Sequence, residues 1–422
     1  MKLQRAKGTQ DFLPEQKIVR QYIIDTLREV FELYGYSQLE TPVLERYETL
    51  SSKYAGGSEI LKEIFTLKDQ GNRELALRYD LTVPFSRVIA MNPQLKMPFK
   101  RYQIGPVFRD GPISTGRVRE FWQCDVDIVG IKKMTADAEI LSLADMVYKK
   151  LGLKVKIKVN NRKVLNSILK EADITENPED IILTIDKLYK IGIKGVKEEL
   201  KSKKLNDKQI NKIINLISIK GSNQQKLKEL SKLENKEGLE EIKELLSYLK
   251  EFKTKVGFDI TLARGLSYYT GTIFEVVLNK DLSLSLGGGG RYDDMISKFM
   301  DSKQEYPAVG ISFGLDRIYN LLVNKNIKKT NTKIFIIPIQ TLKESLSIAQ
   351  KLRENNINTD IDLNNKGISK NLDYANKLNI PYVLFIGENE LKKKKLKLKD
   401  MNSGKERFLT ISQLCNFLNG TR

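Results

Sequence analysis

The sequence predicts an α+β protein in which helices flank an antiparallel sheet, with a helical insertion and a C-terminal α/β segment. Residues 99–130 read as two strands joined by a turn-rich loop, FKRYQIGPVFRDGPISTGRVREFWQCDVDIVG. Residues 162–255 are rich in Lys, Glu, Leu, Ile and Asn at helical spacing. Residues after 333 alternate between strand-like and helix-like runs. We therefore expect a core at 1–161 and 256–324, an insertion at 162–255 and a further domain at 331–422.

Composition limits the classes of function. The 422 residues contain no long apolar run, and the start MKLQRAKGTQDFLPEQ lacks the apolar core of a signal peptide. Two cysteines are too few for a disulfide framework, so we expect a cytoplasmic protein with no membrane partner. A net charge of +19 would attract a nucleic acid, although a coding bias toward A and T would also supply lysine.

The chain contains no histidine. This excludes Ser/His and Cys/His nucleophilic catalysis, histidine metal ligation and histidine proton shuttles. Chemistry must depend on Arg, Lys, carboxylates, Tyr, Gln and backbone groups. A reaction in which an ionised carboxylate attacks fits this restriction, because such a nucleophile needs no base and only charge stabilisation.

The first 98 residues open with a helical pattern from Glu15 to about Tyr34, which Gly35 ends. The strand-like run SQLETPVLER follows, and its Pro42 favours an edge or interface position. In ELALRYDLTVPFSRVIA, we expect Arg78 and Asp80 to share one strand face, Thr82 to continue this polar row and Pro84 to start a helix. A structural ion pair between Arg78 and Asp80 is the alternative.

The second strand of the 99–130 pair separates apolar from polar side chains. Alternation places Trp122, Cys124, Val126 and Ile128 on one face, and Arg119, Gln123, Asp125 and Asp127 on the other. The polar row predicts the floor of a binding site, with a solvated outer face as the alternative. A helix from Thr135 to Gly152 and a strand from Lys154 to Asn161 precede the insertion.

Two motifs follow the insertion. ARGLSYYTG, between two strand-like runs of residues 258–278, combines one arginine with Tyr268 and Tyr269. LGGGGRYDD lacks the GK[ST] ending of a phosphate loop and the spacing of a dinucleotide fold. Its glycines predict close approach of a substrate to the backbone, with Tyr292 at the rim.

The last segments complete the core and the C-terminal domain. AVGISFGLDRIYNLL predicts a strand with two glycines and then a helix carrying Arg317, and residues 325–333 read as a linker. Lys392 to Lys395 form a basic run that we interpret as a solvated turn rather than a specific reader of nucleic acid.

Several of these motifs carry a family resemblance. GRVREFWQCDVDIVG, with Phe108 and Arg109, resembles the second signature motif of class II aminoacyl-tRNA synthetases and, more narrowly, the histidyl-tRNA synthetase family. ARGLSYYTG resembles the histidine-specific signature of that family, and the Arg317 segment resembles the third class II motif. The helix, strand and Pro42 resemble the first motif, and the C-terminal segment resembles the anticodon-binding domain.

The resemblance implies ATP-dependent ligation of L-histidine to tRNA(His) through a histidyl-adenylate, with ATP as a substrate, Mg²⁺, and a homodimer. It implies no particular metal ligands. It places the insertion near the acceptor arm of the tRNA, whereas a solvated helical spacer is the alternative. A noncatalytic, histidine-sensing regulatory subunit of ATP phosphoribosyltransferase is the other functional reading. Such subunits lose the arginines and the anticodon domain that this chain keeps.

Site residues also follow from the resemblance. Arg109 would bind the α-phosphate of ATP, Arg317 the γ-phosphate, and Arg264 would stand where most class II enzymes rely on metal alone. The catalytic set is Arg264, Arg109 and Gln123. Histidine would contact Asp80, Thr82, Arg109, Gln123, Asp127, Arg264, Tyr268, Tyr269 and Tyr292, with Asp127 and the two adjacent tyrosines on the imidazole side. The DGPISTG loop departs from the Arg, Pro, Gln run of many members, so no residue is assigned to adenine or the tRNA 5′ end.

Overall fold

The computed structural model describes residues 2–52, 61–114, 117–265, 268–325 and 330–420. Thr115 and Gly116 of the central loop, Leu266 and Ser267 of ARGLSYYTG and residues 326–329 of the expected linker lie outside them. The chain forms two compact units. The first comprises Met1–Gln10 and Ile23–Asn320, and the second Asp11–Tyr22 and Leu321–Arg422.

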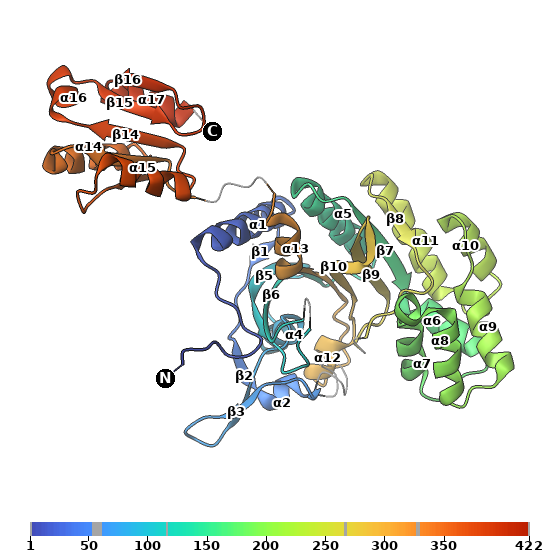
Figure 1. Ribbon diagram of the computed structural model, residues 1–422. Coiled ribbons are helices and arrows are strands. Elements are labelled where there is room, and N and C mark those ends of the chain that lie inside the picture. Colours follow the sequence, from blue (N-terminus) through green and yellow to red (C-terminus); the bar gives the residue numbers. More distant parts are fainter. Residues whose placement is uncertain (1, 53–60, 115–116, 266–267, 326–329, 421–422) are drawn as a thin grey trace. The chain divides into compact units, whose positions relative to one another are not determined.

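An eight-stranded, mostly antiparallel sheet organises the first unit (Figure 1). Only the pairs β1 with β5 and β7 with β8 are parallel among the described strands of this sheet. In sheet order, the strands are β1 Ser37–Gln38, β5 Phe99–Phe108, β6 Glu120–Val129, β11 Ala308–Gly314, β10 Asp281–Arg291, β9 Thr272–Leu278, β7 Val155–Asn161 and β8 Val256–Phe258. The antiparallel sheet with flanking helices confirms the predicted fold class.

The strand pair predicted for residues 99–130 is confirmed. β5 and β6 pair antiparallel along their whole length, from Phe99 opposite Val129 to Phe108 opposite Glu120. The predicted faces of β6 are correct for Cys124, Val126 and Ile128, which are buried in the core. Their neighbours Gln123, Asp125 and Asp127 line a cavity on the opposite face. Trp122 is only half-buried, and Arg119 precedes the strand, so the prediction does not hold for these two residues.

The apolar face of the sheet packs against two helices. They are α1 Pro14–Leu33, of which the part from Ile23 belongs to the same unit as the sheet, and α5 Thr135–Lys150. This part of α1 and α5 lie on one side of the sheet in Figure 1. Phe31 of α1 and Tyr148 of α5 both contact the ring of Phe313 in β11, with centroids 5.6 and 5.7 Å apart. These ring contacts pack β11, the strand paired with β6, against the two helices on the face opposite the polar row.

The polar face is bordered by shorter elements. They are α2 Tyr47–Leu50, α4 Thr82–Met91 and α12 Met295–Phe299, together with a small sheet of β2 Leu44–Arg46, β4 Glu74–Leu77 and β3 Thr66–Lys68. The helix α13 Leu315–Leu322 follows β11 directly. The prediction that Arg78 and Asp80 share a strand face is wrong, because β4 ends at Leu77 and α4 begins at Thr82, two residues before Pro84. Asp80 therefore lies in the turn that enters α4.

The stretch expected as an insertion is helical in the structure. Its helices are α6 Arg162–Glu171, α7 Pro178–Asp186, α8 Leu188–Ser202, α9 Asp207–Ile217, α10 Asn223–Leu230 and α11 Glu237–Glu251. Asn206 and Ser222 each form a capping box at the start of the following helix. The boundaries of the stretch as a domain stay a prediction.

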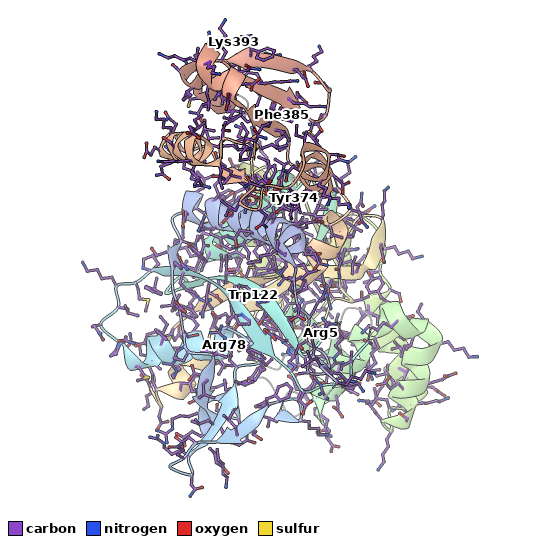
Figure 2. All side chains as sticks on the ribbon, turned by 60° about the vertical axis from the view of Figure 1, so that its left-hand side comes forward. Arg5, Arg78, Trp122, Tyr374, Phe385 and Lys393 are labelled. Atoms are coloured by element: carbon purple, nitrogen blue, oxygen red, sulfur yellow. The ribbon has the colours of Figure 1, made fainter. Side chains whose placement is uncertain are left out.

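The second unit contains a five-stranded mixed sheet. Its strands, in sheet order, are β13 Thr359–Ile361, β12 Ile334–Pro338, β14 Tyr382–Ile386, β15 Leu396–Asp400 and β16 Glu406–Leu409. Its helices are α14 Leu342–Glu354, α15 Ile368–Lys377, α16 Glu388–Lys393 and α17 Ile411–Gly420. One hydrophobic cluster joins the sheet to α14 and α17, and a second joins it to α15. Lys393, in the basic run that ends α16, is exposed and projects outward (Figure 2).

Candidate active site

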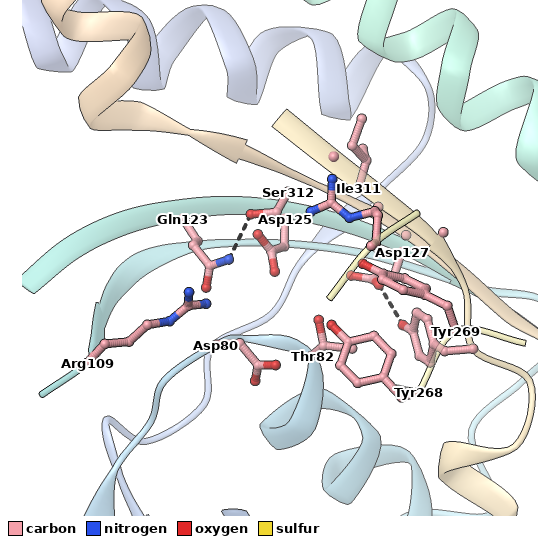
Figure 3. A pocket seen from close by; sticks show the side chains of 16 residues that line it. Asp80, Thr82, Arg109, Gln123, Asp125, Asp127, Tyr268, Tyr269, Ile311 and Ser312 are labelled. Atoms are coloured by element: carbon pink, nitrogen blue, oxygen red, sulfur yellow. Dashed lines mark hydrogen bonds between the residues drawn. The ribbon is translucent and has the colours of Figure 1, made fainter. Parts of the chain in front are cut away.

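A cavity of about 190 Å³ opens on the polar face of the large sheet (Figure 3). All nine residues expected to bind histidine line it, although they come from four separate segments of the chain. The complete lining is Asp80, Thr82, Arg109, Gln123, Asp125, Asp127, Arg264, Tyr268, Tyr269, Gly288, Gly289, Gly290, Tyr292, Gly310, Ile311 and Ser312. The fold thus brings together, around one cavity, the sequence motifs that carry the family resemblance.

Asp80 is held by the first turn of α4. Its Oδ1 accepts a hydrogen bond of 3.1 Å from the Val83 backbone N–H, whereas its buried Oδ2 has no partner among the described residues. Burial raises the pKa of Asp80 to about 6, although this hydrogen bond and Arg109 oppose the increase. Arg78 does not form the alternative ion pair with Asp80, because it donates to the carbonyls of Pro106 and Thr41 at 2.9 and 2.7 Å.

The β6 row is fixed by partners on the neighbouring strands. Gln123 Nε2 donates to the Ser312 hydroxyl at 3.0 Å, which leaves the buried Gln123 Oε1 without a partner in the described part of the chain. Asp127 Oδ1 accepts from the Tyr292 hydroxyl at 2.5 Å, and its Oδ2 forms an ion pair of 2.7 Å with Arg101. Tyr292 is 1% exposed, so the prediction that it lies at the rim is wrong.

Three carboxyl groups share this small space, and burial raises the pKa of each. The pKa of Asp125 is raised to about 7, because its burial and the charge of Asp127 outweigh the attraction of Arg101. The pKa of Asp127 is also raised by burial, and Arg101 and the Tyr292 hydroxyl counteract this increase. A cationic ligand would offset the mutual repulsion of these carboxylates and their loss of hydration.

The glycine run of β10 makes room for two of the predicted site residues. A Cβ at Gly288 would lie 1.9 Å from Arg264 Nη1, and a Cβ at Gly290 would lie 2.7 Å from the ring of Tyr269. A Cβ at Gly289 would lie 1.9 Å from the Gly310 carbonyl of the paired strand. Gly288, Gly289 and Gly290 also line the cavity, so the bare backbone forms part of its wall.

A larger cavity of about 760 Å³ adjoins the first. Arg109, Gln123, Arg264 and Ser312 line both cavities, and Arg317 lines the larger one. Arg317 donates to the Ser285 carbonyl at 2.7 Å. Burial lowers the pKa of Arg317, and the nearby charges of Arg264 and Arg109 add to this decrease. The structure therefore brings three guanidinium groups around one space, where they could bind a polyanion.

Sequence reasoning missed two contributors. Ser312 lies directly opposite Asp125 in the strand pairing, and buried Arg101 lies opposite Asp127 on the other side. Pairing register would have identified them, but one sequence does not determine which strands are neighbours. Asp125 was placed on the correct face by alternation, but no role was assigned to it.

Comparisons with known proteins identify the family to which the chain is similar. Residues 8–318 match the family model Histidyl-tRNA synthetase, and residues 333–421 match the model Anticodon binding domain. A protein of Bacillus cereus (strain ZK / E33L) named Histidine–tRNA ligase 1 is 46% identical over 426 residues, which cover 99% of this chain and 100% of that protein.

Two solved structures are similar over most of the chain. Histidyl-tRNA synthetase from Nostoc sp. PCC 7120 superposes with a TM-score of 0.89 at 30% identity, covering 100% of both chains. A protein from Bacillus halodurans C, described as an ATP phosphoribosyltransferase regulatory subunit/histidyl-tRNA synthetase, has a TM-score of 0.77 at 27% identity. That match covers 90% of this chain and 97% of the other.

Proposed function

The chain belongs to the histidyl-tRNA synthetase family and is a histidine–tRNA ligase, and we propose that its two adjoining cavities bind histidine and ATP for this reaction. In the first step, the histidine carboxylate attacks the α-phosphorus of ATP, histidyl-adenylate forms and pyrophosphate leaves. In the second step, the histidyl group passes to the terminal ribose of tRNA(His).

The observation that carries this proposal is the set of residues shared by the two cavities. Arg109, Arg264 and Gln123 line both, so an amino acid in the smaller cavity and a nucleotide in the larger one would meet at these side chains. Charge that develops on the α-phosphate would lie beside two fixed guanidinium groups. Arg317 lines only the larger cavity among these three arginines, which suits the γ-phosphate end.

The smaller cavity offers complementary groups to a zwitterionic amino acid. Asp80 and Gln123 supply acceptors for the α-ammonium group, with Thr82 beside them, and the two arginines supply donors for the carboxylate. Tyr268, Tyr269 and Tyr292 form one aromatic wall, in which neighbouring ring centroids lie 4.8 and 6.1 Å apart. We assign this wall, with Asp127 behind it, to the imidazole side.

Mg²⁺ would enter with ATP. Among the described residues, no group of three His, Cys, Asp or Glu side chains could hold a metal, and Asp316 is the one carboxylate that lines the larger cavity. Because Mg²⁺ commonly takes one or two carboxylates and otherwise keeps phosphate and water ligands, Asp316 is the residue we expect near it. When bound, the ion would neutralise phosphate charge.

The wider assignments follow from the reaction. We propose a homodimer that acts on tRNA(His) in the cytoplasm, where tRNA is charged, with residues 333–421 binding the anticodon region. No helix in the described part of the chain is long and apolar enough to cross a membrane. A purely regulatory subunit is not favoured, because Arg109, Arg264 and Arg317 converge on one space and the anticodon-binding segment is present.

The direct test is pyrophosphate exchange into ATP with each of the twenty amino acids. We expect exchange with histidine alone. Exchange with another amino acid, or none with histidine in a protein that still binds it, would contradict the assignment.

The raised pKa of Asp80 predicts how histidine binding depends on pH. Its folded pKa of about 6 lies above the value for an unfolded aspartate, so the carboxyl loses its charge at pH values where an exposed one keeps it. If ionised Asp80 binds the α-ammonium group, affinity should fall about tenfold for each pH unit below 6. Titration with triazolylalanine, whose ring stays neutral in this range, isolates the protein groups, and Asp80→Asn should flatten this part of the profile.

Gly288→Ala should displace the Arg264 guanidinium without changing any polar residue. The new Cβ would lie 1.9 Å from Nη1, and the residue does not have the positive φ that would exclude alanine. We expect kcat for pyrophosphate exchange to fall at least tenfold, as for partial loss of one charge-stabilising donor. Gly257→Ala is the matched control, because its Cβ would have no neighbour closer than 4.0 Å among the described atoms. Equal activity of both variants would show that the Gly288 contact does not position Arg264.

A further inference from the structure

One described residue in the lining of the larger cavity comes from the helical stretch expected as an insertion. It is Lys190, which lies in the first turn of α8. The other cationic side chains that line this cavity belong to the core, and they are Arg109, Arg117, Arg264 and Arg317. Lys190 is exposed, and its ammonium group forms no hydrogen bond or ion pair within the described residues. It is therefore available to a ligand in the cavity.

The turn that leads from α7 into α8 lies beside the ARGLSYYTG segment. The side chain of Leu183 in α7 would lie 3.7 Å from a Cβ placed on Gly265. Loss of hydration raises the pKa of Asp186, the last residue of α7, to about 6, and the charges of Arg264 and Lys190 oppose this increase. One cation of the core and one of the insertion therefore lie close to the same carboxyl group.

Tyr189 fixes the turn that carries Lys190 to the large sheet. Its hydroxyl donates to Asp259 Oδ2 at 2.8 Å, and Lys158 Nζ lies 3.8 Å from the centroid of its ring. Asp259 is held in turn by Thr261, whose backbone N–H and hydroxyl donate to Oδ1 at 3.1 and 2.7 Å. Because Lys158 belongs to β7 and Asp259 follows β8, the start of α8 is attached to the core.

The position of Lys190 favours the β- and γ-phosphate groups of ATP. The two arginines assigned to the α-phosphate line both cavities, whereas Lys190 and Arg317 line only the larger one of the two. Each of the four arginines in the lining donates a hydrogen bond to a protein oxygen, and the Lys190 ammonium does not. A lysine ammonium on its flexible stem binds phosphate as a point charge, with three donors that rotate toward different oxygens.

We propose that Lys190 is a further substrate-binding residue, whose ammonium group binds the β- and γ-phosphate oxygens of ATP and the pyrophosphate that leaves. The inference rests on the proposed function. The ammonium supplies only charge and hydrogen bonds, so no proton is transferred. Tyr189 acts through Lys190 and is a positioning residue. The helical stretch thereby takes part in activation of the amino acid before tRNA binds.

The test is pyrophosphate exchange by the full-length protein without tRNA. Lys190→Ala should raise KM for ATP and for pyrophosphate about tenfold, as expected for loss of a hydrogen bond between charged groups, and should leave KM for histidine unchanged. Lys190→Arg should restore most of the loss, and Tyr189→Phe should move the same two constants less. Lys194→Ala is the matched control, because Lys194 is an exposed lysine of the same helix that is not among the described lining residues.

Direct binding provides a second readout that a purely structural role would not produce. Calorimetric titration of the parent protein and Lys190→Ala with magnesium pyrophosphate and, separately, with AMP should show about tenfold weaker binding of pyrophosphate to the variant and equal binding of AMP. The difference for pyrophosphate should shrink as salt is added, because an exposed charge is screened. Melting temperature controls for folding and should be the same for both proteins.

The outcomes separate the two proposals. Absence of histidine-dependent exchange in the parent protein would defeat the proposed function. If the parent protein is active and Lys190→Ala leaves both KM values and the affinity for pyrophosphate unchanged, Lys190 is a solvated lysine and the inference is overturned. It is also overturned if Lys190→Ala weakens AMP as much as pyrophosphate. Normal exchange with impaired transfer to tRNA would likewise overturn it, because the phosphate bound by Lys190 would then belong to tRNA.

Discussion

Arg264→Ala should lower histidine-dependent pyrophosphate exchange by about 10²- to 10³-fold, or about 3 to 4 kcal/mol in transition-state stabilisation. Arg264 lines both cavities, and its buried Nε has no partner among the described residues, so the guanidinium is available to the α-phosphate. Its loss would remove charge stabilisation that is needed mainly in the transition state. The measurements are kcat for exchange and a direct titration of histidine binding.

The expected pattern is a large decrease in kcat with histidine affinity changed much less. Arg317→Ala provides the comparison, because its side chain lines only the larger of the two cavities and should act mainly through KM for ATP. Unchanged turnover in Arg264→Ala would remove this arginine from the mechanism. A collapse of histidine binding equal to the loss of turnover would instead make it a ground-state binding residue.

Arg101→Ala should destabilise the folded protein by about 3 to 5 kcal/mol, because it leaves the carboxylate of Asp127 buried without its counter-ion. Arg101 is fully buried, pairs with Asp127 at 2.7 Å, donates to the Leu81 carbonyl at 3.2 Å and lies 4.3 Å from the Phe85 ring centroid. The carbonyl contact is next to Asp80 and Thr82, so the loss should also weaken histidine binding. Chemical denaturation and histidine titration measure both effects.

The matched control is another arginine paired with an aspartate. Arg73 pairs with Asp69 at 2.6 Å, but its side chain is 79% exposed, so Arg73→Ala should leave the midpoint of denaturation almost unchanged. If the two arginine variants lost equal stability, burial of the Arg101 pair would not explain its contribution to folding stability.

The sequence was sufficient to predict the strands and the face of β6 that lines the site. Alternation along one strand needs no knowledge of its neighbours, which is why Gln123, Asp125 and Asp127 were placed on one face correctly. The same alternation failed at Arg78 and Asp80, because β4 ends at Leu77 and the chain turns toward α4. A turn without glycine or proline at that point gave no signal.

Roles within the site depended on strand pairing. Asp125 and Asp127 have the same face and the same chemistry, and they differ only in what lies opposite each of them. Ser312 lies beside Asp125, whereas Asp127 accepts a hydrogen bond from Tyr292 and pairs with Arg101. The burial of Tyr292 was missed for the same reason, since a tyrosine after four glycines resembles a loop residue although it follows a central strand.

The four glycines of β10 look like a single low-complexity run, yet each position excludes a methyl group for its own reason. An added Cβ would meet the Ser312 carbonyl oxygen at 2.8 Å from Gly287, the Arg264 guanidinium from Gly288, the Gly310 carbonyl from Gly289 and the Tyr269 ring from Gly290. An alanine scan of this run would therefore give unlike phenotypes at adjacent codons. Alanine at Gly289 should impair folding, alanine at Gly288 should lower turnover, and alanine at Gly290 should weaken selection of the amino acid. Neighbouring positions of one glycine run would thus report on separate properties of the enzyme.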